Sequence, residues 1–165
     1  SDMTVKKYID ILAGTFMVRV LTPWHANTSK RLVKSPKLYL RDSGLFHALQ
    51  SVDTFDSLLA HPKRGASWEG FALETVTITL QMEAEGQFFW ATHAGAELDL
   101  FWQSRGKNFG MEFKCADAPT RTRSMQAAME DLKLSHLWVV YPGPESYALG
   151  KKITVLPLRD IRQVG

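Results

Sequence analysis

One stretch of the chain, Glu97–Lys114, carries charged residues inside the pattern of a β-hairpin. Polar and apolar residues alternate in Glu97–Trp102 and again in Met111–Cys115, and a period of two is typical of strands. The linker, residues 104–108, is polar and contains Gly106, as a hairpin loop should. The stretch therefore predicts two short strands joined by a turn.

The two predicted strands divide their residues between a charged face and an apolar face. Residues two apart in a strand share a face, so Glu97 and Asp99 point the same way, and so do Glu112 and Lys114. If the other face packs on a core, the charged face is either open to water or forms a polar site. The predicted apolar face holds Leu98, Leu100, Trp102, Met111, Phe113 and Cys115.

Composition limits the class of protein. The 165 residues, 45% hydrophobic and 22% charged, are typical of one globular domain. A single cysteine, Cys115, excludes an internal disulfide and suits the reducing cytoplasm. No apolar run approaches the roughly 20 residues that span a bilayer, so no membrane partner is expected. The net charge is +3, but lysines and arginines are in excess in residues 1–45 and 101–165, whereas acidic residues are in excess in residues 46–100. This distribution suits either the binding of a polyanion beside a metal site or ordinary surface solvation.

The remaining segments predict an α/β fold, with helices on a mixed sheet. Local signals conflict over residues 68–80, which fit both a helical stripe and a β-branched strand, and both interpretations stay open. A helix followed by two extended segments, as at the start of the chain, is the order in which a winged-helix unit ends. Helices are predicted at 4–15 and 121–134, and extended segments at 16–21, 31–40, 87–92, 137–141 and 152–156.

Asp99, Glu112 and Lys114 have the residue types of a metal-dependent phosphodiesterase. Two carboxylates from adjacent strands supply part of the oxygen shell that Mg²⁺ prefers and leave room for water and a phosphate. A lysine on the same face can orient water or stabilise the transition state. An exposed ladder of salt bridges across the hairpin would produce the same spacing, so both interpretations stay open.

Asp99 followed by Glu112-Phe113-Lys114 resembles the D…(D/E)-x-K signature of the PD-(D/E)XK nucleases. A wider resemblance covers residues 4–141. It is to an uncharacterised domain that follows the ATPase in a large family of bacterial and archaeal AAA-type ATPases. The motifs that carry it are, in order, RLVKSPKLYLRDSGLFHAL, WEGFALE, AGAELDL and MEFK.

The resemblance implies a restriction-endonuclease-like fold, with residues 1–45 as a winged-helix-like remnant and linker and residues 46–165 as the nuclease-like domain. It implies that residues 68–82 are a helix. The implied site holds Mg²⁺ or Mn²⁺, with Asp99 and Glu112 as metal ligands and Lys114 as the catalytic lysine. Glu74 is implied to be the helical glutamate aimed at the metal. Glu97 is implied to be an auxiliary ligand or a partner of Lys114.

A basic stretch before the predicted core supplies candidate phosphate contacts. Lys30, Arg31, Lys34 and Lys37 can contact a nucleic-acid backbone, or can form a solvated basic loop. No phosphate-binding loop of the ATPase type is present, so no ATPase activity is expected from this chain and the AAA-type ATPase part would precede it.

The function expected from the sequence is a metal-dependent nuclease domain acting on DNA. The alternative is a non-catalytic module of the same ATPase that binds nucleic acid or protein. The sequence leaves the substrate open among single-stranded, duplex and branched DNA and RNA.

Overall fold

The predicted hairpin forms in the computed structural model. Its strands are β4 (Glu97–Ser104) and β5 (Lys107–Phe113), and they are antiparallel. Only Arg105 and Gly106 lie between them, with φ of 48° and 71°. Positive φ at both positions gives a two-residue turn whose twist matches that of the flanking strands. The strands are therefore longer, and the loop shorter, than the sequence pattern predicts.

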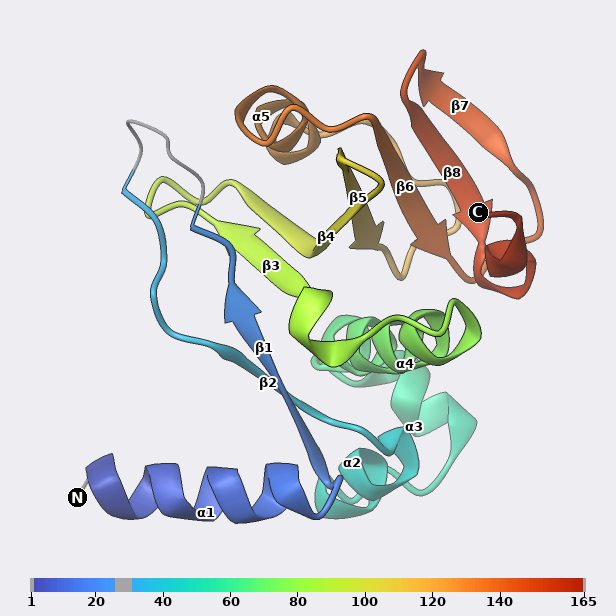
Figure 1. Ribbon diagram of the computed structural model, residues 1–165. Helices are drawn as coiled ribbons and strands as arrows, with labels where there is room; N and C mark the ends of the chain where they lie inside the picture. Colours follow the sequence, from blue (N-terminus) through green and yellow to red (C-terminus); the bar gives the residue numbers. More distant parts are fainter. Residues whose placement is uncertain (1, 26–30, 165) are drawn as a thin grey trace.

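A mixed sheet organises the molecule (Figure 1). The structure describes residues 2–25 and 31–164, within which eight strands form one sheet in the order β2-β1-β3-β4-β5-β6-β8-β7. The other strands are β1 (Val18–Pro23), β2 (Lys37–Leu40), β3 (Phe88–Ala91), β6 (His136–Tyr141), β7 (Tyr147–Gly150) and β8 (Ile153–Pro157). The helices are α1 (Asp2–Gly14), α2 (Ser43–Leu49), α3 (Phe55–Ala60), α4 (Arg64–Thr79) and α5 (Arg123–Asp131), with 3₁₀ turns η1 (Ala84–Gly86) and η2 (Leu158–Gln163).

The strand directions confirm the coarse fold prediction. β5, β6 and β8 run parallel, while β4 and β7 pair with them antiparallel. The chain is therefore an α/β protein with helices on a mixed sheet, and the restriction-endonuclease-like fold stays a prediction. None of the helices within the described ranges has the length and apolar character needed to cross a bilayer.

Two helices cover opposite faces of the sheet and form two cores (Figure 1). On one face Leu73 and Val76 of α4 are fully buried against β4 and β5. On the other face Met125 and Ala128 of α5 are fully buried. The central strands are therefore buried on both sides, which explains why Asp99 and Glu112 lie in the interior rather than on a solvated face.

A bulge in β4 corrects the predicted apolar face. Phe88 pairs with Phe101 and Trp90 with Leu98, so three steps along β4 match two steps along β3. The extra residue interrupts the alternation. Leu98 consequently packs in the core under α5, whereas Leu100 packs in the core under α4. The prediction that Leu98 and Leu100 share a face is wrong, because simple alternation does not include a bulge.

The ambiguous segment is helical. α4 begins at Arg64 and ends at Thr79, so the helix expected at residues 68–82 is confirmed and the strand interpretation is wrong. The β-branched residues are accommodated because the hydroxyls of Thr75 and Thr77 donate to carbonyls of the preceding turn. Burial of the apolar face thus overrides a weak local preference for a strand.

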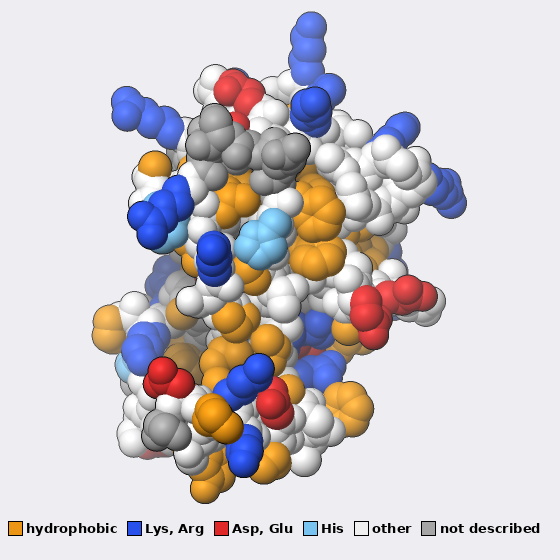
Figure 2. Space-filling view, turned by 60° about the vertical axis from the view of Figure 1, so that its left-hand side comes forward, with side chains coloured by type: hydrophobic (Ala, Val, Ile, Leu, Met, Phe, Trp, Pro, Cys, Tyr) orange, Lys and Arg blue, Asp and Glu red, His pale blue; other side chains and the backbone are white. Residues whose placement is uncertain are grey.

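The N-terminal segment joins the main sheet. β1 pairs antiparallel with β2 and parallel with β3, so residues assigned to a winged-helix-like remnant share a sheet with the nuclease-like domain. The boundary after residue 45 stays a prediction. α1 buries none of its residues, and Met3, Tyr8 and Ile11 are all more than half exposed. Figure 2 shows hydrophobic side chains exposed beside lysines and arginines on this side of the molecule.

We expect the core under α4 to carry much of the stability. Leu73→Ala removes a fully buried side chain and should lower the free energy of unfolding by about 2–5 kcal/mol. Leu49→Ala, at an exposed position of α2, is the control and should change it by less than about 0.5 kcal/mol. Urea denaturation measures both. Equal losses in the two variants would contradict the burial of Leu73.

Candidate metal centre

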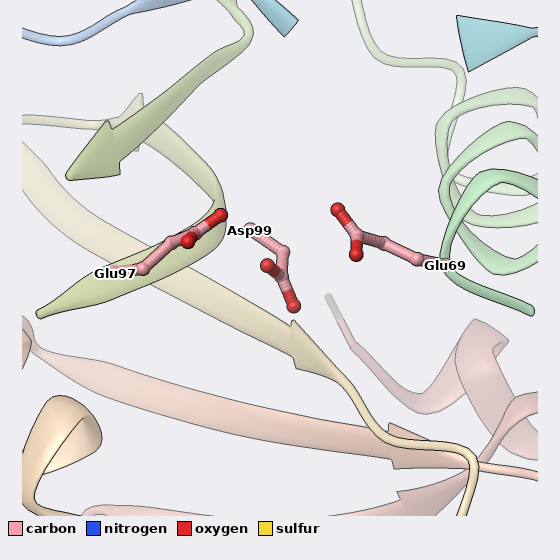
Figure 3. A group of neighbouring side chains, drawn as sticks. All are labelled: Glu69, Glu97 and Asp99. Carbon is pink, nitrogen blue, oxygen red and sulfur yellow. The ribbon is translucent and has the colours of Figure 1, made fainter. Parts of the chain in front are cut away.

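Four elements bring charged side chains together where β4 begins. Glu97 and Asp99 lie on β4, and Glu69 reaches them from α4 (Figure 3). Lys37 comes from the first position of β2. Glu112 lies near the end of β5 and Lys114 follows it. Elements distant in sequence therefore converge on one acidic cluster, which we define as Glu69, Glu97, Asp99 and Glu112.

Three of these carboxylates can share one cation. Ligand oxygens of Glu69, Glu97 and Asp99 all lie within 4.8 Å of one another. Octahedral ligands at about 2.1 Å from Mg²⁺ are about 3–4 Å apart, so small side-chain shifts suffice to bring the oxygens to that geometry. Asp99 is held in place because its Oδ2 accepts a hydrogen bond of 2.9 Å from the main-chain N–H of Phe113.

Lys37 places an ammonium group among the same three carboxylates. Its Nζ lies 3.0 Å from Oε1 of Glu69 and 3.4 Å from Oδ1 of Asp99, and it also pairs with Glu97. Burial acts to lower the pKa of Lys37, but the surrounding negative charges, that of Asp99 first, raise it above its ordinary value. Tyr39, two residues along β2, donates a hydrogen bond of 2.5 Å to Glu69.

Glu112 is the most buried carboxylate of the acidic cluster. It is 3% exposed, and its Oε2 lies 2.9 Å from Nζ of Lys114. Its Oε1 is buried without a hydrogen-bond partner among the described residues. Burial, followed by the charge of Asp99, raises the pKa of Glu112 to about 8, although Lys114 opposes the shift. Burial and the charge of Glu69 likewise raise the pKa of Asp99.

The cluster fits a divalent cation. When all are ionised, the four carboxylates pair with the ammonium groups of Lys37 and Lys114 among the described residues, which leaves an excess of two negative charges there. A hard dication with oxygen ligands supplies the matching charge. Oε1 of Glu112, which has no hydrogen-bond partner among residues 2–25 and 31–164, is a further candidate oxygen ligand. The residues present therefore fit the Mg²⁺ or Mn²⁺ that the sequence predicts, although the ion itself stays a prediction.

Glu74 lies apart from the acidic cluster. Its Oε1 pairs with Nε of Arg19, and its Oε2 lies 3.0 Å from Nε of Arg41. Arg19 also donates to Gln87 and Thr77. Glu74 and Glu69 are five positions apart, which turns them about 140° from each other around the helix. The structure brings Glu69, rather than Glu74, to the cluster.

The sequence pattern predicts neither Glu69 nor Lys37 as a member of the cluster. Glu69 does stand in the WEGFALE motif, one residue after Trp68. On a helix, Glu69 lies on the same face as Leu73 and Val76, which follow it by four and seven positions and are buried. Glu74 lies on a different face. This helical spacing is the signal that could have identified Glu69.

The basic stretch divides between the cluster and the surface. Lys37 is engaged by carboxylates, whereas Arg31 and Lys34 are exposed. Lys30 lies outside the described residues. The segment is fixed beside β3, because the N–H of Val33 donates to the carbonyl of Ala91, and Ala91 pairs with Glu97 on its other side. Phosphate contact by these residues stays a prediction.

Comparison with known proteins identifies two family models of unknown function. A domain of unknown function, DUF4143, matches residues 64–161, and a second, DUF8612, matches residues 1–56. Two proteins described as uncharacterised, from Mycobacterium bovis and Mycobacterium tuberculosis, are each 41% identical over 165 residues. The match covers 100% of this chain and 37% of each relative, so the chain spans little more than a third of their length. No solved structure matches the chain.

Glu74→Ala should affect stability rather than metal binding. Removing the partner of Arg19 and Arg41 leaves partly buried cations uncompensated, at a cost of about 3–5 kcal/mol in the free energy of unfolding. Glu83→Ala, at an exposed site, is the control. Calorimetry of Mn²⁺ binding should give the wild-type affinity for both variants. Loss of binding in folded Glu74→Ala would instead make Glu74 a ligand.

The metal-free protein should lose stability as the pH rises. The native pKa of Glu112 is about 8 against an ordinary value of 4.5, so the folded chain holds a proton that the unfolded chain releases between those values. The free energy of unfolding therefore falls from about pH 4.5 to about pH 8. Urea titrations with a chelator present should show this slope, and Glu112→Gln should flatten it. An equal slope in both proteins would assign it to other groups.

Proposed function

We propose that this chain, which belongs to the DUF4143 family, is a divalent-metal-dependent phosphodiesterase domain that cleaves DNA. One observation carries the proposal: carboxylates from α4, β4 and β5 converge, and a buried oxygen of Glu112 has no hydrogen-bond partner within the described part of the chain. Structural salt bridges ordinarily satisfy their buried oxygens. An orphaned oxygen beside a carboxylate cluster is therefore better explained by a ligand that binds there.

Each charged residue has a distinct part in this proposal. Asp99, Glu69 and Glu97 hold the cation, and Glu112 completes its protein ligands. A bound Mg²⁺ or Mn²⁺ lowers the pKa of a water and neutralises charge on the phosphate. Lys114 is 40% exposed, so its ammonium is anchored by Glu112 and still accessible to a phosphate oxygen. It stabilises the charge that develops there.

The surface beside the cluster supplies phosphate contacts in the proposal. Val33 and Glu97 flank Ala91 from opposite sides, which places them two strand spacings, or about 10 Å, apart. Arg31 and Lys34 adjoin Val33 and are exposed. They would hold the DNA backbone while the scissile phosphate reaches Lys114.

The proposal extends to the longer protein. The curated relatives are more than twice as long as this chain, which accords with an attached AAA-type ATPase that gates the nuclease. The PD-(D/E)XK signature and the mixed sheet support a restriction-endonuclease-like fold. In this setting the chain supplies the cleavage site and the rest of the protein supplies ATP-driven control.

A second candidate is a non-catalytic module that binds a protein partner. The exposed apolar residues of α1, including Met3 and Tyr8, favour it, because large apolar side chains on a surface mark interaction sites. In this case Lys37 would occupy the acidic cluster permanently as a structural counter-ion.

Cleavage assays with matched variants separate the two candidates. We expect Mn²⁺-dependent cleavage of DNA by the wild type, and a loss of about 10²–10³-fold in rate for Lys114→Ala because it removes charge stabilisation. Asp99→Ala should also abolish Mn²⁺ binding in calorimetry. Lys107→Ala, an exposed lysine at the other end of β5, is the control and should retain full activity.

The cleavage assays should test single-stranded, duplex and branched DNA, because the sequence leaves the substrate open among them. The nuclease proposal fails if Lys114→Ala cleaves at the wild-type rate or if Mn²⁺ binds Asp99→Ala as tightly as the wild type. In the second case the carboxylates are not ligands, and the binding module becomes the better candidate.

A further inference from the structure

Lys37 occupies the position that a bound cation would need. Its ammonium group has three N–H donors, and three different carboxylates surround it: Glu69, Glu97 and Asp99. These are the same three residues whose oxygens lie close enough to share a metal. The side chain of Lys37 is 24% exposed, so most of it is held within the structure rather than in solvent.

A lysine in this position stabilises the carboxylates of the metal-free protein. Carboxylates that approach one another away from water repel and lose hydration, and only a nearby positive charge offsets both costs. Lys114 is committed to Glu112 at 2.9 Å. Among the described residues, Lys37 is the cation that contacts the other three carboxylates.

The ammonium and a metal ion cannot occupy the three carboxylates together. Lys37 donates to carboxylate oxygens at about 3 Å, whereas Mg²⁺ binds its oxygen ligands at about 2.1 Å. Two cations that share these oxygens at such short distances repel each other. Space for the lysine exists nearby, because a surface hollow of about 420 Å³ lined by Lys37, Tyr39 and Glu69 opens beside the cluster.

We propose that Lys37 is an internal counter-cation, which holds Glu69, Glu97 and Asp99 in place without metal and leaves them when a divalent cation binds. This inference rests on the metal site of the proposed function. It makes Lys37 a competitor of the metal and sets the affinity of the site. The predicted contact of Lys37 with DNA becomes possible only in the metal-bound state, when its ammonium is released.

Calorimetric titration with Mn²⁺ tests the competition. Lys37→Met keeps most of the unbranched side chain and removes its charge, so it should bind Mn²⁺ about tenfold more tightly, or better, than the wild type. Lys63→Met removes an exposed charge at the start of α4, which carries Glu69, and should bind as the wild type does. Without metal, Lys37→Met should melt at a lower temperature than the wild type, and saturating Mn²⁺ should reduce the difference.

The outcomes separate this inference from the proposed function. If the wild type binds Mn²⁺ and Lys37→Met binds it no more tightly, the counter-cation role is overturned and the metal site stands. If neither protein binds Mn²⁺, both proposals are overturned. If Lys63→Met gains as much Mn²⁺ affinity as Lys37→Met, the gain comes from the change in the overall charge of the protein, and the role of Lys37 is also overturned.

A measurement on the wild type covers the case in which Lys37→Met does not fold. Lysine-ammonium NMR should show a protected Lys37 signal in the metal-free protein, assigned by its absence in Lys37→Arg. Saturating Mg²⁺ should abolish the protection as the side chain enters solvent. A Lys37 signal that Mg²⁺ leaves unchanged, while Mg²⁺ binding is evident elsewhere in the spectrum, overturns the proposal.

Discussion

Repulsion among buried carboxylates is the constraint on which the arrangement of the surrounding elements depends. Asp99 and Glu112 lie on neighbouring strands in the interior, and Glu69 is brought to them by α4. Their lost hydration is offset by Lys37, by Lys114 and by the main-chain N–H of Phe113. These compensating groups function only if β2, β5 and α4 dock where they do. Charge therefore fixes the position of α4 on the sheet together with the apolar contacts of Leu73 and Val76.

The two glutamates of α4 show how differently one helix can use the same side chain. Glu74 has an arginine at each carboxylate oxygen, and its neighbours Thr77 and Gln87 complete the coordination of Arg19. That network is closed and has the character of a structural ion pair. The cluster around Glu69 is open, because in the part of the chain that the structure describes it has more carboxylates than cations and an oxygen of Glu112 without a hydrogen-bond partner. Completeness of pairing, rather than the mere presence of acidic residues, distinguishes a structural network from a candidate ligand site.

Local patterns predicted the hairpin and the amphipathic helices, because each depends on residues close in sequence, and the alternation of these helices with strands predicted an α/β fold. Asp99, Glu112 and Lys114 were predicted as a group for the same reason, since they lie on one hairpin. The bulge that separates Leu98 from Leu100 has no local signature, because it depends on how β3 pairs with β4. The position of Lys37 depends on β2 pairing with β1 and β1 with β3, more than 60 residues along the chain. A basic run in the sequence does not reveal that one of its lysines faces three carboxylates.

The pairing of β1 with both β2 and β3 has a mechanical consequence. Leu21 of β1 is the register partner of Lys37, and β1 follows α1 after a turn at residues 15–17. α1 is thus connected to the carboxylate cluster through hydrogen-bonded strands instead of a flexible tether. A protein partner that bound the exposed apolar side chains of α1 and rotated the helix would displace β1. Because Leu21 of β1 pairs with Lys37, the backbone that carries the Lys37 side chain would move with it. A helix that buries none of its own residues would in this way be coupled to the position of Lys37.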